Sequence, residues 1–201
     1  MYATLGLKGF YPVEEAYTLN KPHTNFPSHT DRQKTPGVDL TTGSLGQGMS
    51  TAVGAALGNK MDGRDNHVFV FVGDGEWEAA QFAAHYKLDH LICFVDYNKR
   101  QLDGACEDVM SHGKGIGAKF DAFGWNVIDL PDGNDVEAIY DAVQLAYDVK
   151  GKPTCIVLNT VKGKGATFAE PSGAHSSQPT PEQWDEAIKA SEAAYAAVKA
   201  Q

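Results

Sequence analysis

The stretch Val68-Phe69-Val70-Phe71-Val72 decides the fold that the sequence predicts, because it is continuously apolar and is followed by a glycine, Gly73. A strand that is buried on one face alternates apolar and polar residues, whereas a strand that is covered on both faces is apolar throughout. Strands of the second kind are typical of parallel sheets. We therefore expect His67–Val72 to form a buried strand of a parallel sheet.

Strand-like and helix-like segments alternate along the rest of the chain. This alternation predicts an α/β fold, a doubly wound and mostly parallel sheet with helices on both faces, in which ligands bind at the carboxyl ends of the strands. Thr180 and Pro181 are expected to begin the last helix as its cap and first residue, with Gln183 reaching back. The other expected strands are Leu91–Val95, Asn126–Leu130 and Thr154–Asn159. Four helices are expected: one with Leu45, Met49, Val53 and Leu57 on one face, Trp77–Leu88, Asp135–Val149, and a terminal helix with Trp184, Ile188, Tyr195 and Val198 on its apolar face.

The composition limits the classes of protein that the sequence fits. With 201 residues, 42% of them hydrophobic, the chain suits a single globular domain over residues 1–201, with Trp77, Trp125 and Trp184 as core anchors. A net charge of −9 argues against general binding of nucleic acids, which needs a cationic surface. No apolar run is long enough to cross a membrane. Two of the three cysteines lie in apolar runs, which predicts buried thiols in a reducing cytoplasm.

Polar residues follow two neighbouring strands of the predicted sheet. Gly73-Asp74-Gly75-Glu76 comes directly after the most apolar strand, and Asn98 follows the next strand along the chain. Oxygen ligands at two adjacent strand ends suit a small, hard cation, and glycines let backbone amides approach a phosphate. A Mg²⁺ ion that bridges Asp74, Asn98 and a diphosphate is therefore physically sensible. An ordinary strand-end turn is the alternative, and the spacing alone favours it.

A colinear series of segments resembles one family of enzymes. Gly73-Asp74-Gly75 closed by Asn98 resembles the thiamin diphosphate motif, and the other segments are similar to transketolases up to about Gly165. The chain is most like the diphosphate-binding N-terminal subunit of the two-chain transketolases, which implies the thiamin diphosphate-binding fold. The segments are His29-Thr30-Asp31-Arg32, Thr35-Pro36-Gly37-Val38, Thr42-Gly43-Ser44-Leu45-Gly46-Gln47-Gly48, Ala83-Ala84-His85-Tyr86-Lys87-Leu88-Asp89, Leu102-Asp103-Gly104, Ala122-Phe123-Gly124-Trp125, Lys150-Gly151-Lys152-Pro153-Thr154 and Val161-Lys162-Gly163-Lys164-Gly165.

The resemblance implies thiamin diphosphate and Mg²⁺ (or Ca²⁺) as cofactors and gives roles to individual residues. His29 matches the histidine that faces the sugar donor, and His175 matches a second substrate-side histidine, for which a surface role remains the alternative. Both are expected to be catalytic. The implied metal ligands are Asp74, Asn98 and the backbone carbonyl of Arg100, and the implied cofactor-binding residues are Gly43, Leu45, Asp74, Gly75, Glu76, Asn98 and Leu102.

Three departures from the resembled family affect these expectations. The chain begins at a point that matches the interior of the family's N-terminal subunit, so the upstream segment of that subunit is missing. The stretch between Gly75 and Asn98 is shorter by about six residues, or about one and a half helical turns. The pyrimidine-binding domain with its catalytic glutamate is also absent. We therefore expect the sequence to be part of a longer working polypeptide, with a degenerate copy as the alternative.

The resemblance implies transfer of a two-carbon ketol unit from a ketose phosphate to an aldose phosphate. The partner would be a C-terminal transketolase subunit that carries the pyrimidine-binding domain, in a heterodimer or heterotetramer. Two alternatives remain open. In the first, the chain acts in another thiamin diphosphate enzyme, such as one that resembles deoxyxylulose-phosphate synthase; in the second, it is a non-catalytic subunit that stabilises another chain. A nicotinamide-binding domain is disfavoured because no GxGxxG follows the first strand.

Overall fold

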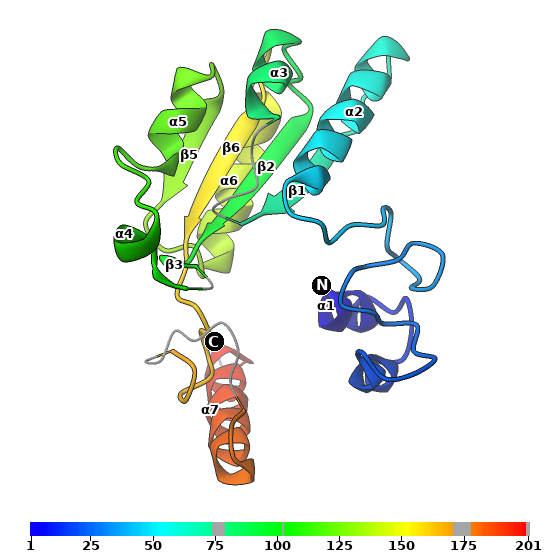
Figure 1. Cartoon of the computed structure of the whole chain (residues 1–201), viewed down its shortest axis with the longest axis vertical. Helices are drawn as coiled ribbons and strands as arrows, with labels where there is room; N and C mark the ends of the chain where they lie inside the picture. Colours follow the sequence, from blue (N-terminus) through cyan, green and yellow to red (C-terminus); the bar gives the residue numbers. More distant parts are fainter. Residues whose placement is uncertain (74–78, 102, 171–177, 200–201) are drawn as a thin grey trace.

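The computed structural model describes residues 1–73, 79–101, 103–170 and 178–199, and its centre is a parallel sheet with helices on both faces (Figure 1). Within these residues the sheet has four strands, all parallel, in the order β1-β2-β6-β5. This confirms the predicted fold class. The four strands are β1 (Val68–Val72), β2 (Leu91–Tyr97), β5 (Asn126–Leu130) and β6 (Thr154–Asn159), and a separate antiparallel pair is formed by β3 (Arg100–Gln101) and β4 (Gly104–Ala105).

The helices alternate with the strands as the sequence predicts. α6 begins and ends within one residue of the expected bounds, and α2 contains three of the four residues expected on one face of that helix, Met49, Val53 and Leu57. α3 is short, and the residues that precede Ala79 in the expected helix, including Trp77, lie outside the described part of the chain. The helices are α1 (Tyr2–Leu7), the 3₁₀ helix η1 (Val13–Thr18), α2 (Gln47–Met61), α3 (Ala80–His85), α4 (Cys106–Val109), α5 (Ile116–Ala122), α6 (Val136–Asp148) and α7 (Pro181–Lys199).

The core has two layers, one on each face of the sheet. α2, α3 and α5 pack against one face, and α6 covers the other (Figure 1). Trp125 is buried in the first layer, where its indole N–H donates to the carbonyl of Ala80 over 2.8 Å and ties α3 to the start of β5. Cys93 and Cys155 are fully buried register partners on β2 and β6, as expected from their apolar runs.

Three expectations about individual side chains were wrong. β1 is an edge strand among the described residues, and the buried cluster under α6 draws on β2, β6 and β5 but not on β1, so Phe69 and Phe71 are 45% and 74% exposed instead of buried. Leu45 is 78% exposed because α2 begins only after Gly46, which adopts a left-handed φ of 80°. Trp184 is 51% exposed and contacts Phe168 edge-on, so it is no core anchor.

The terminal helix α7 begins with the expected capping box. The backbone N–H of Thr180 donates to Oε1 of Gln183 over 2.9 Å, and the N–H of Gln183 donates to the Thr180 hydroxyl oxygen over 3.3 Å. These two bonds satisfy backbone donors that a helix start leaves without partners. Among the helices in the described part of the chain, none is both long and apolar enough to cross a membrane.

Candidate functional site

An open cleft of about 520 Å³ lies where the parallel strands end. Asp96 and Asn98 contribute from the end of β2, and Thr160 follows β6 directly. Ligands of doubly wound sheets bind at this carboxyl end, because the loops there leave room between the helices. The remaining lining residues are Asn134, Val161, Lys162, Gly163, Lys164 and Ala166.

Asn98 is held in a tight turn at the end of β2. Its side-chain Oδ1 accepts a hydrogen bond from the backbone N–H of Arg100 over 3.1 Å, and its Nδ2 lies 3.5 Å from Oδ2 of Asp96. Arg100 then opens the short β3–β4 hairpin, which pairs it with Ala105. The structure thus brings Asn98 and Arg100, both predicted from the sequence, into one ordered turn beside the cleft.

Lys99 fixes this turn to the neighbouring strands and was not identified from the sequence. It adopts a left-handed φ of 67°, and its Nζ donates to Oδ1 of Asn159 over 2.5 Å. Asn159 in turn donates through Nδ2 to Oδ1 of Asp129 over 2.6 Å. Desolvation lowers the pKa of the Lys99 ammonium, and the nearby Asp129 carboxylate opposes that shift. The only feature of the sequence that points to Lys99 is its position directly after Asn98.

His29 and Gly43 meet in the loop that leads into α2. Gly43 has a φ of 145°, and a Cβ added there would lie 2.7 Å from Cδ2 of the His29 ring. Thr30 and Thr42 form a β-bridge beside them, with their hydroxyl oxygens 3.0 Å apart. Gly43 is therefore needed for the imidazole to lie where it does. In Figure 1 this loop enters α2 at the end of the sheet where the strands finish.

The remaining predicted site residues divide into two groups. Leu45 lies next to Gly46 in the same loop and is exposed, which leaves it available to a ligand. Asp74, Gly75, Glu76, Leu102 and His175 lie outside the described residues.

The described donors suit the cofactors that the resemblance implies. The Asn98 carboxamide oxygen and backbone carbonyls of the turn are hard oxygen donors, which Mg²⁺ and Ca²⁺ prefer. The neighbouring 520 Å³ cleft is bordered by Lys162 and Lys164, whose charges suit a phosphate group. In the described residues we find no group of three or more His, Cys, Asp or Glu side chains arranged to hold a metal. Among the described residues, the oxygens offered to a metal at this turn are therefore amide and carbonyl oxygens.

Comparison with known proteins identifies the family. The family model described as transketolase, thiamine diphosphate binding domain, matches residues 1–196. The chain is 47% identical over 195 residues to the 6-deoxy-6-sulfo-D-fructose transketolase subunit SqwG of Clostridium sp., covering 94% of this chain and 70% of the relative. It is 38% identical over 175 residues to an apulose-4-phosphate transketolase subunit of Actinobacillus succinogenes, covering 84% of this chain and 62% of the relative.

Solved structures give the same result. The transketolase of Pichia stipitis in complex with sedoheptulose 7-phosphate is 32% identical, with a TM-score of 0.77, over 83% of this chain and 27% of that one. The transketolase of Campylobacter jejuni is 28% identical, with a TM-score of 0.75, over 85% of this chain and 28% of that one. The chain thus spans about two thirds of the curated subunits that it matches and about a quarter of the solved enzymes. It belongs to the transketolase family and contains that family's thiamine diphosphate binding domain.

Proposed function

We propose that this chain is the diphosphate-binding subunit of a two-chain transketolase. It would transfer a two-carbon ketol unit from a ketose phosphate to an aldose phosphate, with thiamin diphosphate and Mg²⁺ as cofactors. The family match over residues 1–196 supports this function, and two relatives are named as subunits of transketolases. The observation that carries the proposal is the turn of Asn98 and Arg100 beside the cleft at the carboxyl end of the sheet.

The proposed metal ligands are Asn98, the backbone carbonyl of Arg100 and Asp74. Gly75 and Glu76 would contact the diphosphate, and the loop residues Gly43 and Leu45 together with Leu102 would contact the rest of the cofactor. A cation at this place explains how a chain of charge −9 holds an anionic cofactor, because the local charge outweighs the distant net charge.

Thiamin diphosphate, when bound, supplies the carbon nucleophile and the electron sink for carbon–carbon cleavage. The chain's own residues orient the sugar and move protons. His29 is proposed to hydrogen-bond the donor's hydroxyl and carbonyl oxygens and to exchange protons with them, and His175 is proposed as a second such group. Gly43 keeps the His29 ring in its place because no side chain competes for that space.

A separate chain is proposed to carry the pyrimidine-binding domain, as the word "subunit" in the names of two relatives suggests for those proteins. We propose that residues 1–201 fold as one domain of a heterodimer or heterotetramer. Three buried thiols fit a reducing compartment such as the cytoplasm.

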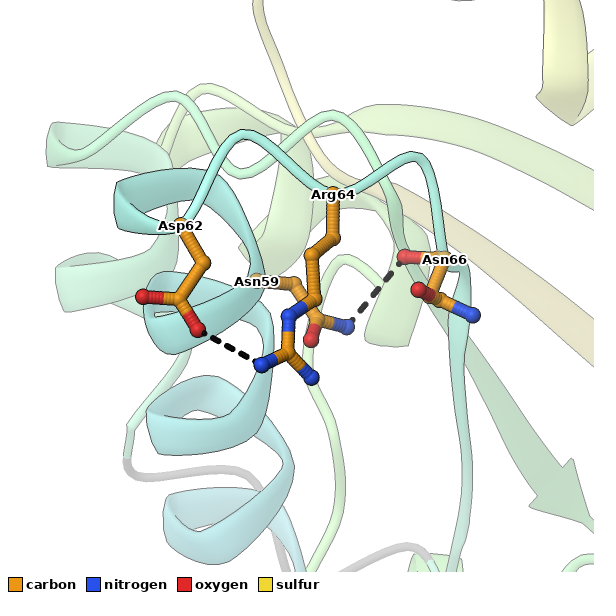
Figure 2. A network of polar contacts seen from close by, with 4 residues as sticks. All are labelled: Asn59, Asp62, Arg64 and Asn66. Atoms are coloured by element: carbon orange, nitrogen blue, oxygen red, sulfur yellow. Dashed lines mark hydrogen bonds and ion pairs between the residues drawn. The ribbon is translucent and has the colours of Figure 1, made fainter.

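Cofactor titration tests the proposal. The chain, purified with its partner subunit, should bind thiamin diphosphate only when Mg²⁺ is present, as measured by calorimetry. Asn98→Ala should weaken this binding by ~100-fold or more, because one oxygen ligand is lost. Asn66→Ala is the matched control, because Asn66 lies in the exposed turn between α2 and β1 (Figure 2). Wild-type protein that binds no cofactor would refute the proposal and favour a non-catalytic stabilising subunit.

A screen of sugar phosphate donors and acceptors, with transfer of the two-carbon unit as the readout, then identifies the reaction. Activity with pyruvate as donor, and none with ketose phosphates, would favour an enzyme of the deoxyxylulose-phosphate synthase type instead.

A further inference from the structure

We propose that Asp96 is a positioning residue that determines which end of the Asn98 carboxamide faces the cleft. Both residues line the cleft, and both lie at the carboxyl end of β2. The inference rests on the proposed function in one respect, the use of Asn98 as a metal ligand.

Three groups contact one another in series at this place. The Thr160 hydroxyl donates to Oδ1 of Asp96, and Oδ2 of Asp96 lies 3.5 Å from Nδ2 of Asn98. The backbone N–H of Thr160 also donates to the carbonyl of Tyr97 over 3.3 Å. Asp96 therefore joins the ends of β2 and β6 to the side chain of Asn98.

The contacts on the two sides of the Asn98 carboxamide specify the same orientation. The two ends of a carboxamide have nearly the same shape, so neighbouring donors and acceptors decide which end is oxygen. The ionised carboxylate of Asp96 only accepts hydrogen bonds, so it selects the NH₂ group. The backbone N–H of Arg100 only donates, so it selects the oxygen, at 3.1 Å.

This orientation matters for a cation because only the oxygen end of a carboxamide can coordinate it. An oxygen that accepts one hydrogen bond from Arg100 retains a second lone pair for a metal. If the carboxamide turned by 180°, its NH₂ group would meet both the backbone N–H and the cation. Asp96 opposes this turn because it would bring the Asn98 oxygen against its carboxylate.

The alternative role for Asp96 is purely electrostatic, since a carboxylate attracts a nearby cation without orienting anything. Two substitutions separate the two roles. Asp96→Asn removes the charge but keeps the contacts, because its oxygen can accept from Asn98 while its NH₂ donates to the Thr160 hydroxyl, which can also accept. Asp96→Leu removes both the charge and the contacts.

The first experiment is a calorimetric titration of Mg²⁺ into the full chain with its partner and saturating thiamin diphosphate. Asp96→Leu should weaken Mg²⁺ binding by about 10–100-fold, the usual cost of losing a group that orients a ligand. Asp96→Asn should bind Mg²⁺ within about 3-fold of wild type, a smaller change than that range. Asp148→Leu, at the exposed end of α6, controls for a general effect of losing a carboxylate. Equal weakening by Asp96→Asn and Asp96→Leu would overturn the positioning role.

The second experiment needs no metal. The side-chain NH₂ signals of Asn98 can be assigned in ¹⁵N-edited NMR spectra of the chain alone by their loss in Asn98→Asp. In wild type and Asp96→Asn, these NH₂ protons should exchange with solvent more slowly than those of an exposed asparagine. The slowing should be lost in Asp96→Leu and reduced in Thr160→Val, which keeps the shape of the side chain but not its hydroxyl. Unchanged exchange in Asp96→Leu would overturn the inference. The proposed function fails separately, if wild type shows the NMR signature but takes up no cofactor.

Discussion

The two ends of the sheet contain polar groups of different kinds. At the carboxyl end, Asp96, Asn98 and Thr160 meet as donors and acceptors beside a 520 Å³ cleft. At the amino end, the rings of His67 and His90 stack at 4.5 Å, beside a cavity of only 170 Å³ to which His90 contributes. The first end therefore has the features of a binding site, and the second those of a structural contact.

The histidine stack explains why the amino end is a weak candidate for chemistry. Nε2 of His67 is buried and has no hydrogen-bond partner among the described residues. Tyr147 packs edge-on against the same ring at 4.7 Å. With no hydrogen-bond partner for this nitrogen among the described residues, the contacts of the His67 ring given above are packing contacts. The comparison teaches that partnered polar groups beside an open cleft, and not polar groups as such, distinguish the candidate site.

The largest expected loss of stability comes from Gly133→Ala at the carboxyl end. A Cβ there would lie 2.6 Å from the backbone carbon of Leu158 and 2.7 Å from the backbone nitrogen of Asn159. Because backbone atoms cannot move aside cheaply, we expect a loss of about 1–3 kcal/mol in the free energy of unfolding, measured by urea denaturation. Gly54→Ala, an exposed helical position with open space, should instead stabilise the chain by about 0.5–1 kcal/mol. Equal stability of the two variants would contradict the geometry at Gly133.

Gly43→Ala, also at the carboxyl end of the sheet, should reduce turnover more than stability. The added methyl group would displace the His29 ring, and a φ of 145° strains any other residue. We expect transketolase turnover to fall by at least ~10-fold, because a misplaced catalytic group loses its reaction geometry. Stability should change less than in Gly133→Ala, because the loop is exposed. Normal turnover measured in the assembled enzyme would separate His29 from the reaction.

At the amino end of the sheet, His67 should make the free energy of unfolding depend on pH. Burial, followed by the charges of His90 and Lys150, lowers the pKa of His67, and the carboxylates of Asp65 and Asp89 only partly oppose this. As the pH falls, the unfolded state therefore binds a proton at His67 before the folded state does. The contribution of His67 to the free energy of unfolding is fully present above its ordinary pKa of 6.5 and is lost as the pH drops below that value.

His67→Phe should flatten this slope between about pH 6.5 and the lower folded-state pKa, in thermal denaturation at a series of pH values. His23→Phe, an exposed histidine for comparison, should leave the slope unchanged. A slope that persists in His67→Phe would assign the effect to another group.

The smallest effect is expected for the exposed ion pair of Arg64 and Asp62, also at the amino end. Their charged groups are 3.0 Å apart, with side chains 62% and 57% exposed, in the turn after α2 (Figure 2). Arg64→Ala should change the free energy of unfolding by less than about 1 kcal/mol, because solvent screens such pairs. A larger loss in urea denaturation would mean that this turn contributes more to the fold than its exposure suggests.

The sequence predicts the sheet better than the side chains around it. Buried strands such as Thr154–Asn159 are recognised because their residues are apolar without interruption, and the structure places this strand at the same residues. Phe69 and Phe71 follow the same pattern but are exposed, because a sequence does not show which strand lies at the edge.

The candidate site divides in the same way. Asn98 and Arg100 were predicted from a resemblance, and the structure places them in one turn. The contacts of Asp96 and Lys99 could not be predicted, because they depend on Thr160 and Asn159, which lie 64 and 60 residues away in the chain. Donor and acceptor geometry of this kind arises only when strands assemble. The roles of Asp74 and His175, outside the described residues, stay predictions.

The buried sulfur atoms offer a way to time local opening of this molecule. Cys93 and Cys155 are fully buried at the centre of the sheet, and burial together with a hydrogen bond to Cys93 raises the pKa of Cys155, which suppresses the reactive thiolate. Cys106, also buried, lies next to the hairpin that follows Asn98. A thiol reagent should therefore modify Cys106 at the rate at which the hairpin detaches, and the central pair only when the whole sheet comes apart.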